Sequence, residues 1–211
     1  RHVAYRRKSA QRVLNEIAYL VRRYGIWAVA LTDNVFPLDA HGEMIELLQQ
    51  QQPDYTLSYE MRPNLRREQV RDIVRAGIGQ VQLGIESLST HVLHLMHKGV
   101  TATQNVNALR WGRYYGLTIN WNLLWGFPGE TEEDYRQQSE LIPLLWHLQP
   151  PSSFSPVWME RFSPFFEDRE SFPVRMIEPQ RSYGSIYPRD MDLQRLAYFF
   201  DYQFADELPV A

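Results

Sequence analysis

Polar side chains follow five apolar segments of this chain, and together they could bind a polar ligand. Asp33 and Asn34 end the first segment, Glu60 and Arg62 the second, Glu86 and Ser87 the third, and Glu160 and Arg161 the last. Carboxylates accept hydrogen bonds from hydroxyl and amino groups, and arginine pairs with carboxylates. Any one of these residues could simply mark the end of a strand, but the recurrence at five ends favours a shared site.

The fourth apolar segment ends in the most specific local pattern of the chain, which consists of Gly126, Phe127, Pro128, Gly129, Glu130 and Thr131. Two glycines let the backbone approach a ligand closely, while Thr131 can cap the helix that follows. A plain turn between strand and helix is the alternative. Within the same segment Asn120 and Asn122 alternate with bulky residues, so both amides occupy one face of a strand.

Other catalytic patterns are missing from the sequence. The chain has no cysteine, which excludes disulfides, thiolate nucleophiles and any cluster held by its own cysteines. There is no phosphate-binding Walker loop, dinucleotide fingerprint or serine nucleophile elbow. His91, His94 and His97 recur every third residue, without a carboxylate at a matching offset, and this favours structural or surface histidines over a metal site.

Composition narrows the classes of partner. With 22 Lys and Arg against 25 Asp and Glu, the formal net charge of -3 disfavours nucleic acid and anionic membrane surfaces. No apolar run is long enough to span a membrane, and the amino end has no signal-peptide pattern. The sequence therefore predicts a soluble, cytoplasmic protein without a membrane or nucleic-acid partner.

Repeating helix and strand units must position these residues. Ser9 predicts the start of a helix that ends before Gly25, followed by a strand over residues 26–32. The pattern recurs as predicted helices at 42–51, 68–76 and 101–115, a helix opened by Thr131, and strands at 55–60, 80–85, 117–125 and 155–162. The strands are apolar at nearly every position, as in sheets covered on both faces. A last helix is expected near residues 190–204.

Strands that alternate with helices indicate a parallel sheet, as a barrel or as an open doubly wound sheet. In both folds ligands gather where the carboxyl ends of the strands meet the loops, which is where the polar residues above are expected.

Several motifs resemble those of radical S-adenosylmethionine enzymes. They are residues 83–88, LGIESL; residues 96–101, MHKGVT; and residues 125–131, WGFPGET. Residues 64–70, NLRREQV; 148–151, LQPP; and 161–166, RFSPFF, resemble the cobalamin-type members that mature ribosomally made peptides. The resemblance covers nearly the whole chain.

The resemblance implies an α/β fold, a partial TIM-like barrel of six βα units. Because the chain has no cysteine, the first strand and the Cys-x-x-x-Cys-x-x-Cys cluster loop are expected upstream of Arg1. Residues 1–165 would then hold the second to sixth βα units, and residues 166–211 a C-terminal extension with a closing helix. The strand left without its neighbour predicts self-association through that edge, or its occlusion by residues 1–8.

The resemblance also assigns roles to residues that bind S-adenosylmethionine. Asp33 and Asn34 stand where the family has a Gly-Gly-Glu-like segment for the methionine amino group, and this sequence departs from that segment. Glu86 and Ser87 match the position that contacts the ribose or the methionine carboxylate. The loop Gly126, Phe127, Pro128 and Gly129 matches the adenine-lining loop. Glu60, Arg62 and Arg161, with Asn120 and Asn122, are further candidates for the cofactor or substrate.

The implied activity is modification of a precursor peptide, by methylation of an unactivated carbon with a 5′-deoxyadenosyl radical. The cofactors would be S-adenosylmethionine, a [4Fe-4S] cluster and cobalamin in an upstream domain, and these 211 residues alone would be inactive. Two alternatives stay open: a radical enzyme acting on a tetrapyrrole, tRNA or lipid, and a non-catalytic barrel that binds a peptide.

Overall fold

The computed structural model describes residues 8–32, 41–168, 170–172 and 174–205. Their elements are, in chain order, α1 (Ala10–Tyr24), β1 (Ala28–Ala30), α2 (His41–Gln51), β2 (Thr56–Met61), α3 (Arg67–Arg75), β3 (Ile78–Leu83), α4 (Thr90–Leu95), α5 (Ala102–Tyr115), β4 (Thr118–Asn120), β5 (Asn122–Trp125), α6 (Glu132–Leu141), the 3-10 helix η1 (Ile142–Leu145), β6 (Ser153–Pro156), β7 (Met159–Glu160), α7 (Pro164–Glu167), β8 (Val174–Pro179), α8 (Tyr183–Ile186), α9 (Leu193–Leu196) and β9 (Phe199–Phe204).

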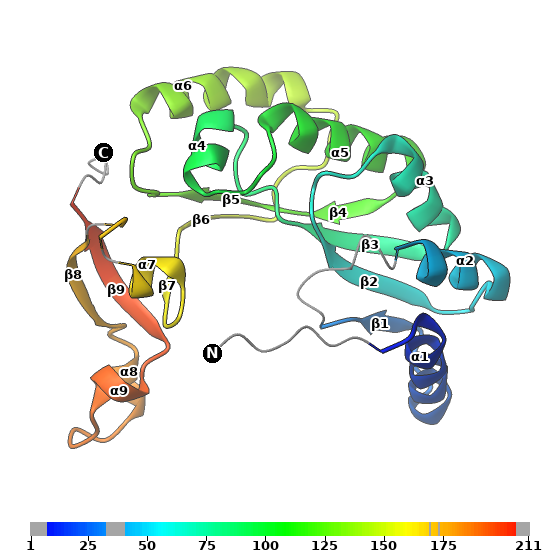
Figure 1. The fold of residues 1–211 in the computed structure, drawn as a ribbon, viewed down its shortest axis with the longest axis horizontal. Helices are drawn as coiled ribbons and strands as arrows, with labels where there is room; N and C mark the ends of the chain where they lie inside the picture. The colour runs from blue at the N-terminus through cyan, green and yellow to red at the C-terminus, as the bar shows by residue number, and fades with distance from the viewer. Residues whose placement is uncertain (1–7, 33–40, 169, 173, 206–211) are drawn as a thin grey trace.

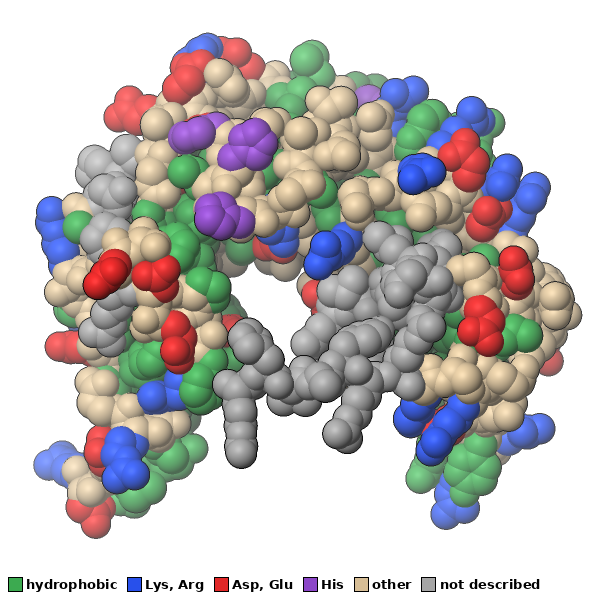
Figure 2. Space-filling view, in the orientation of Figure 1, with side chains coloured by type: hydrophobic (Ala, Val, Ile, Leu, Met, Phe, Trp, Pro, Cys, Tyr) green, Lys and Arg blue, Asp and Glu red, His purple; other side chains and the backbone are tan. Residues whose placement is uncertain are grey.

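The parallel strands form an arch, with helices on its outer side (Figure 1). Strands β1 to β4 pair in chain order, and β5 pairs in parallel with β6. An isolated parallel bridge between Glu86 and Leu123 joins the end of β3 to β5. Helices α3, α4, α5 and α6 lie above the sheet, and the opposite, concave face borders the hollow of the arch (Figures 1 and 2).

The predicted helix boundaries have identifiable causes. Ser9 caps α1 by accepting a hydrogen bond from the Arg12 backbone N–H, and Gly25 ends the helix in the left-handed conformation at φ 62°. Thr101 opens α5 with a capping box, which confirms the prediction from its sequence. Thr131 opens α6 in the same manner.

The main core lies between the sheet and its outer helices and uses only one face of each strand. In β2 the side chains of Leu57, Tyr59 and Met61 are buried, whereas Ser58 is half-buried and Glu60 exposed. The expectation of strands that are apolar on both faces is therefore wrong, because none of the helices that the structure describes covers the concave face (Figure 1).

Two predicted strands are divided in the structure. The segment predicted at 117–125 forms β4 and β5, which are separated at Trp121. The backbone carbonyl of Trp121 accepts a hydrogen bond from Ser152 at 2.6 Å, and its indole N–H donates to the carbonyl of Gln149 at 3.0 Å. The segment predicted at 155–162 forms the end of β6 and then β7, which belongs to another sheet.

The closing helix predicted near residues 190–204 is wrong. Only the four-residue α9 is helical there, and β9 follows as the central strand of an antiparallel sheet with the order β7, β9, β8. Alternation in β9 places Phe200 and Phe204 in a second small core. Since β7 precedes residue 165 and already pairs with β9, the second sheet begins before the domain boundary expected from the sequence.

Helices long and apolar enough to cross a membrane do not occur in the part of the chain that the structure describes.

Candidate functional site

The turn after β3 presents an ion pair at the carboxyl end of the sheet. Glu86 adopts φ 60°, a conformation that is uncommon for residues other than glycine and that often marks functional turns. Its backbone carbonyl accepts a hydrogen bond from Leu124 of β5 at 2.8 Å, and its carboxylate contacts the ammonium of Lys98 at 2.9 Å. Both side chains are partly exposed. The pair lies close to Gly84, where a Cβ atom would stand 3.1 Å from the Glu86 carboxylate.

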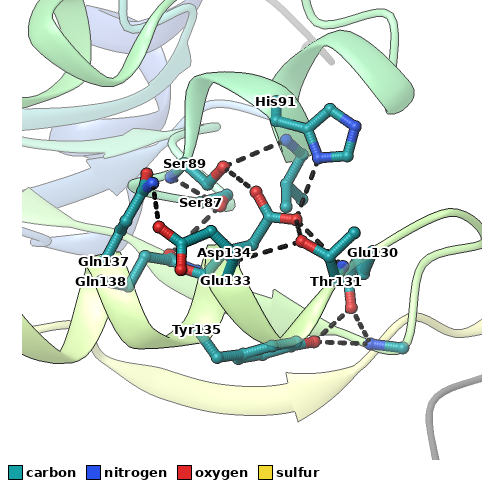
Figure 3. A network of polar contacts seen from close by, with 12 residues as sticks. Ser87, Ser89, His91, Glu130, Thr131, Glu133, Asp134, Tyr135, Gln137 and Gln138 are labelled. Atoms are coloured by element: carbon teal, nitrogen blue, oxygen red, sulfur yellow. Dashed lines mark hydrogen bonds and ion pairs between the residues drawn. The ribbon is translucent and has the colours of Figure 1, made fainter.

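Two amide side chains hold this turn in place from behind, the buried Asn105 and the half-buried Gln138, and Figure 3 shows Gln138 beside Ser87. Asn105 of α5 donates to the carbonyls of Ile85 and Ser87 at 3.0 and 2.9 Å. The hydroxyl of Ser87 donates to Gln138 of α6 at 3.2 Å, and Ser87 is fully buried. Ser87 therefore supports the turn. It exposes no atom at the carboxyl end of the parallel sheet, which we call the rim.

Asp134 connects the amino ends of α4 and α6 (Figure 3). Its buried carboxylate accepts hydrogen bonds from the hydroxyls of Ser89 and Thr131 at 2.6 and 2.7 Å, and it contacts Nδ1 of His91 at 2.9 Å. Burial alone would raise the pKa of Asp134, but the hydrogen bonds from Ser89, His91 and Thr131 outweigh it and hold the pKa at about 2. The ionised carboxylate thus ties together the helices behind two rim loops.

The loop after β5 is closed by a second buried carboxylate. Gly126 and Gly129 adopt φ 81° and 84°, which glycine permits without strain. The backbone N–H of Gly126 donates to Glu130 at 2.9 Å, and the hydroxyl of Tyr135 donates to the same carboxylate (Figure 3). Burial raises the pKa of Glu130, although these two hydrogen bonds act in the opposite direction.

Four other predicted site residues lie on the same side of the sheet. Glu60 is the penultimate residue of β2, and Arg62 follows the strand. Both side chains are exposed beside the turn that begins at Gly84, whose N–H donates to the Met61 carbonyl. Asn120 and Asn122 share the concave face as their alternation predicts, because the intervening Trp121 and the flanking residues are buried toward the helices.

Three predicted site residues lie away from the open rim. Phe127 is buried, and its ring meets those of Phe165 and Phe172 edge-on at 5.2 and 6.2 Å. Pro128 is buried as well. Arg161 belongs to the antiparallel sheet region, where its guanidinium donates to the Ala197 carbonyl at 2.7 Å and covers the rings of two phenylalanines. Asp33 and Asn34 lie outside the described residues.

Sequence reasoning missed Lys98 at the rim and the residues that support the rim from behind. Lys98 occurs in a motif that carried the resemblance, yet no role was expected for it. Asn105 and Gln138 have no local signal, because their contacts span 18 to 51 residues of the chain. The carboxylate partner of His91 was missed for the same reason, since Asp134 is 43 residues away. Across the described segments, His, Asp and Glu side chains form no group of three that could hold a metal ion.

The family follows from a comparison with known sequences. The model of the radical SAM superfamily matches residues 1–142, which is well over half of the chain. The chain belongs to the radical SAM superfamily. This membership and the parallel sheet confirm the predicted partial barrel.

A protein of Pyrococcus horikoshii described as an uncharacterized methyltransferase is 31% identical over 133 residues. The match covers 62% of this chain and 29% of the relative, so the chain spans under a third of that protein.

Solved structures of cobalamin-dependent radical enzymes have the same fold. The methyltransferase TsrM from Kitasatospora setae, with cobalamin and a [4Fe-4S] cluster bound, superposes with a TM-score of 0.64 at 19% identity, covering 76% of this chain and 31% of TsrM. The cobalamin-dependent enzyme OxsB, with aqua-cobalamin bound, gives a TM-score of 0.58 at 16% identity, covering 68% of this chain and 23% of OxsB.

Proposed function

We propose that this chain is the S-adenosylmethionine-binding barrel of a radical methyltransferase that methylates a carbon atom of a ribosomally made peptide. Superfamily membership supports the cofactor, and the relative from P. horikoshii supports methyl transfer. The observation that carries the proposal is the Glu86 and Lys98 ion pair, which stands at the carboxyl end of parallel strands.

The ion pair fits the amino-acid end of S-adenosylmethionine. That end carries an ammonium and a carboxylate on one carbon, so it can pair with a carboxylate and an ammonium that lie side by side. Lys98 would bind the ligand carboxylate, and Glu86 would accept hydrogen bonds from its ammonium or ribose hydroxyls. Both protein groups are partly exposed, so each can replace its contact with the other by a contact with the ligand at little desolvation cost.

The glycine loop supplies the second surface for the cofactor. Gly126 follows Leu124 by two residues, about 7 Å along the strand, and Leu124 is hydrogen-bonded to Glu86. A Cβ atom at Gly126 would meet no other described atom within 4 Å, so the backbone there leaves space for a planar adenine ring.

The iron–sulfur cluster finds no thiolate ligands in this chain. A [4Fe-4S] cluster is held by cysteine thiolates, and because the sequence has none, we propose that residues outside these 211 hold the cluster. Cobalamin is included because TsrM and OxsB bind it. When bound, S-adenosylmethionine and its partner cofactors supply the methyl group and the radical chemistry that an unactivated carbon requires.

Isotope transfer tests the proposal. The full-length enzyme, reconstituted anaerobically with iron, sulfide and hydroxocobalamin, is incubated with S-adenosylmethionine bearing a trideuterated methyl group. The acceptors are the short peptides encoded beside its gene. We expect one peptide to gain a trideuteromethyl group on carbon, as located by fragmentation mass spectrometry. Cofactor cleavage without label in any peptide would reject the peptide substrate, and no cleavage at all would reject the radical enzyme.

A pair of glycine variants separates the site from general backbone strain. Gly126→Val and Gly77→Val both force a β-branched residue into a positive φ, at 81° and 79°, and at neither position would a Cβ atom meet another described atom within 4 Å. Of the two, Gly126 lies on the rim. We expect Gly126→Val to abolish methyl transfer, while Gly77→Val lowers stability but retains transfer in the folded fraction.

A further inference from the structure

The concave face of the sheet carries polar side chains in register across three strands. Helices cover the alternate residues, whereas Gln80 and Gln82 of β3 are exposed and Asn120 of β4 is half-buried. The parallel register aligns Gln82 with Asn120 on one side and with Glu60 on the other. We call Gln80, Gln82 and Asn120 the amide patch.

The amide patch has unused hydrogen-bonding capacity. Each side-chain amide has two N–H donors and one acceptor, and none of the three makes a hydrogen bond with another described residue. Glutamine and asparagine are disfavoured in strands relative to β-branched residues, and the inner faces of parallel sheets are usually apolar. Packing in the main core does not require these amides, because none of the three side chains belongs to it.

The charges around the amide patch restrict the ligand. Strands β1 to β6 contain no Lys or Arg, and Glu60 is their single acidic residue. The exposed Arg62 follows β2 and lies two residues beyond Glu60, outside the amide patch. RNA phosphates and the carboxylates of a tetrapyrrole require cations. A lipid chain requires an apolar lining. A ligand that presents neutral N–H and C=O groups satisfies the amides best.

We propose that the amide patch binds the backbone amides of the peptide substrate. This inference rests on the proposed function and assigns the substrate-binding residues within it. Gln80 and Gln82 are two residues apart, about 6.6 Å along the strand. An extended peptide presents its backbone groups to one side with the same two-residue repeat. Backbone recognition fixes the position of the peptide and tolerates variation in its side chains.

Peptide binding to the full-length holoenzyme tests the amide patch. The probe is hexaalanine with an acetylated amino end and an amidated carboxyl end, and its backbone N-methylated analogue lacks the N–H donors. We expect the wild type to bind the probe about tenfold more tightly than the analogue, and Gln80→Leu/Gln82→Leu to lose about tenfold for the probe. The exposed strand residue Gln203 of β9 provides the matched control Gln203→Leu, which should bind like the wild type.

The outcomes separate the two proposals. Unchanged probe binding in the double variant, or no probe binding by the wild type, would overturn the role of the patch. Tighter binding of coproporphyrin or oleate through the same glutamines would assign the face to another substrate and overturn it as well. S-adenosylmethionine affinity, measured in each variant, should stay unchanged. A wild type that does not bind S-adenosylmethionine would instead contradict the proposed function.

Discussion

Behind the rim, Asp134 contacts the side chains of Ser89, His91 and Thr131. Its carboxylate meets the hydroxyls of Ser89 and Thr131, and these two residues cap α4 and α6. A buried charge is stable only when hydrogen bonds replace water, and here they do so to the extent that the pKa falls to about 2.

Asp134→Asn should destabilise the fold in a pH-dependent manner. The folded pKa of about 2 lies below the ordinary 3.8, so the carboxylate contributes about 2 kcal/mol of stability above pH 4, which is lost as the pH falls toward 2. In urea unfolding, the free energy of unfolding of Asp134→Asn should be lower than that of the wild type by about 2 kcal/mol at neutral pH. The difference should be much smaller at about pH 2.

A control for this prediction uses another helix cap. Asp192 caps α9 at the surface, and asparagine caps helices as well as aspartate, so Asp192→Asn should be nearly neutral. A pH-independent loss in Asp134→Asn, equal at neutral and acidic pH, would mean that packing and not charge explains the effect.

Part of this residue-level picture was predictable. Thr131 and the acids after it predict a helix start, which the structure confirms, and it adds a capping box between Thr131 and Asp134. The contacts of Asp134 with Ser89 and His91 depend on the packing of α4 against α6, and no local pattern specifies a partner more than 40 residues away.

At the scale of elements, sequence periodicity predicted the helices of the parallel sheet. It did not predict a strand whose formation depends on pairing with distant segments. Apolar spacing, caps and terminal glycines predicted α1, α3 and α5 to within one residue at most ends. The segment Phe199–Phe204 becomes a strand because β7 and β8 flank it on both sides. That tertiary pairing overrides the helical spacing of its apolar residues.

Two glycines in helices predict opposite changes in stability. Gly112 faces β4 so closely that a Cβ atom would lie 2.2 Å from Cδ1 of the buried Ile119, whereas nothing lies within 4 Å at Gly42 of α2. Overpacking costs about 1–3 kcal/mol, and alanine gains about 1 kcal/mol over glycine in a helix. We expect thermal unfolding to show Gly112→Ala as less stable and Gly42→Ala as more stable than the wild type. A stabilised Gly112→Ala would contradict the close packing of α5 on β4.

The described residues form an arch, and β1 is the last described strand at one end of its sheet (Figure 1). Among the described strands β1 pairs with β2 alone, and Tyr24 and Trp27 beside it are 64% and 73% exposed. Exposed strand edges with nearby apolar side chains recruit other strands. We therefore expect the 211-residue chain to self-associate, and Ala28→Lys on this edge to reduce association in sedimentation velocity. The control Gln203→Lys, in the other sheet, should not reduce association. A wild type that stays monomeric at high concentration would contradict the prediction.

The central claim is that Glu86 and Lys98 bind S-adenosylmethionine at the rim of the arch. Its most direct test is calorimetric titration of S-adenosylmethionine into the reconstituted full-length enzyme carrying Glu86→Gln or Lys98→Met. Loss of a charge-assisted hydrogen bond, about 1.5–3 kcal/mol, predicts a loss of affinity of roughly 10- to 100-fold in each variant. Lys8→Met, which removes an exposed lysine paired with Glu16, should leave affinity unchanged. Wild-type affinity in both Glu86→Gln and Lys98→Met would contradict the account.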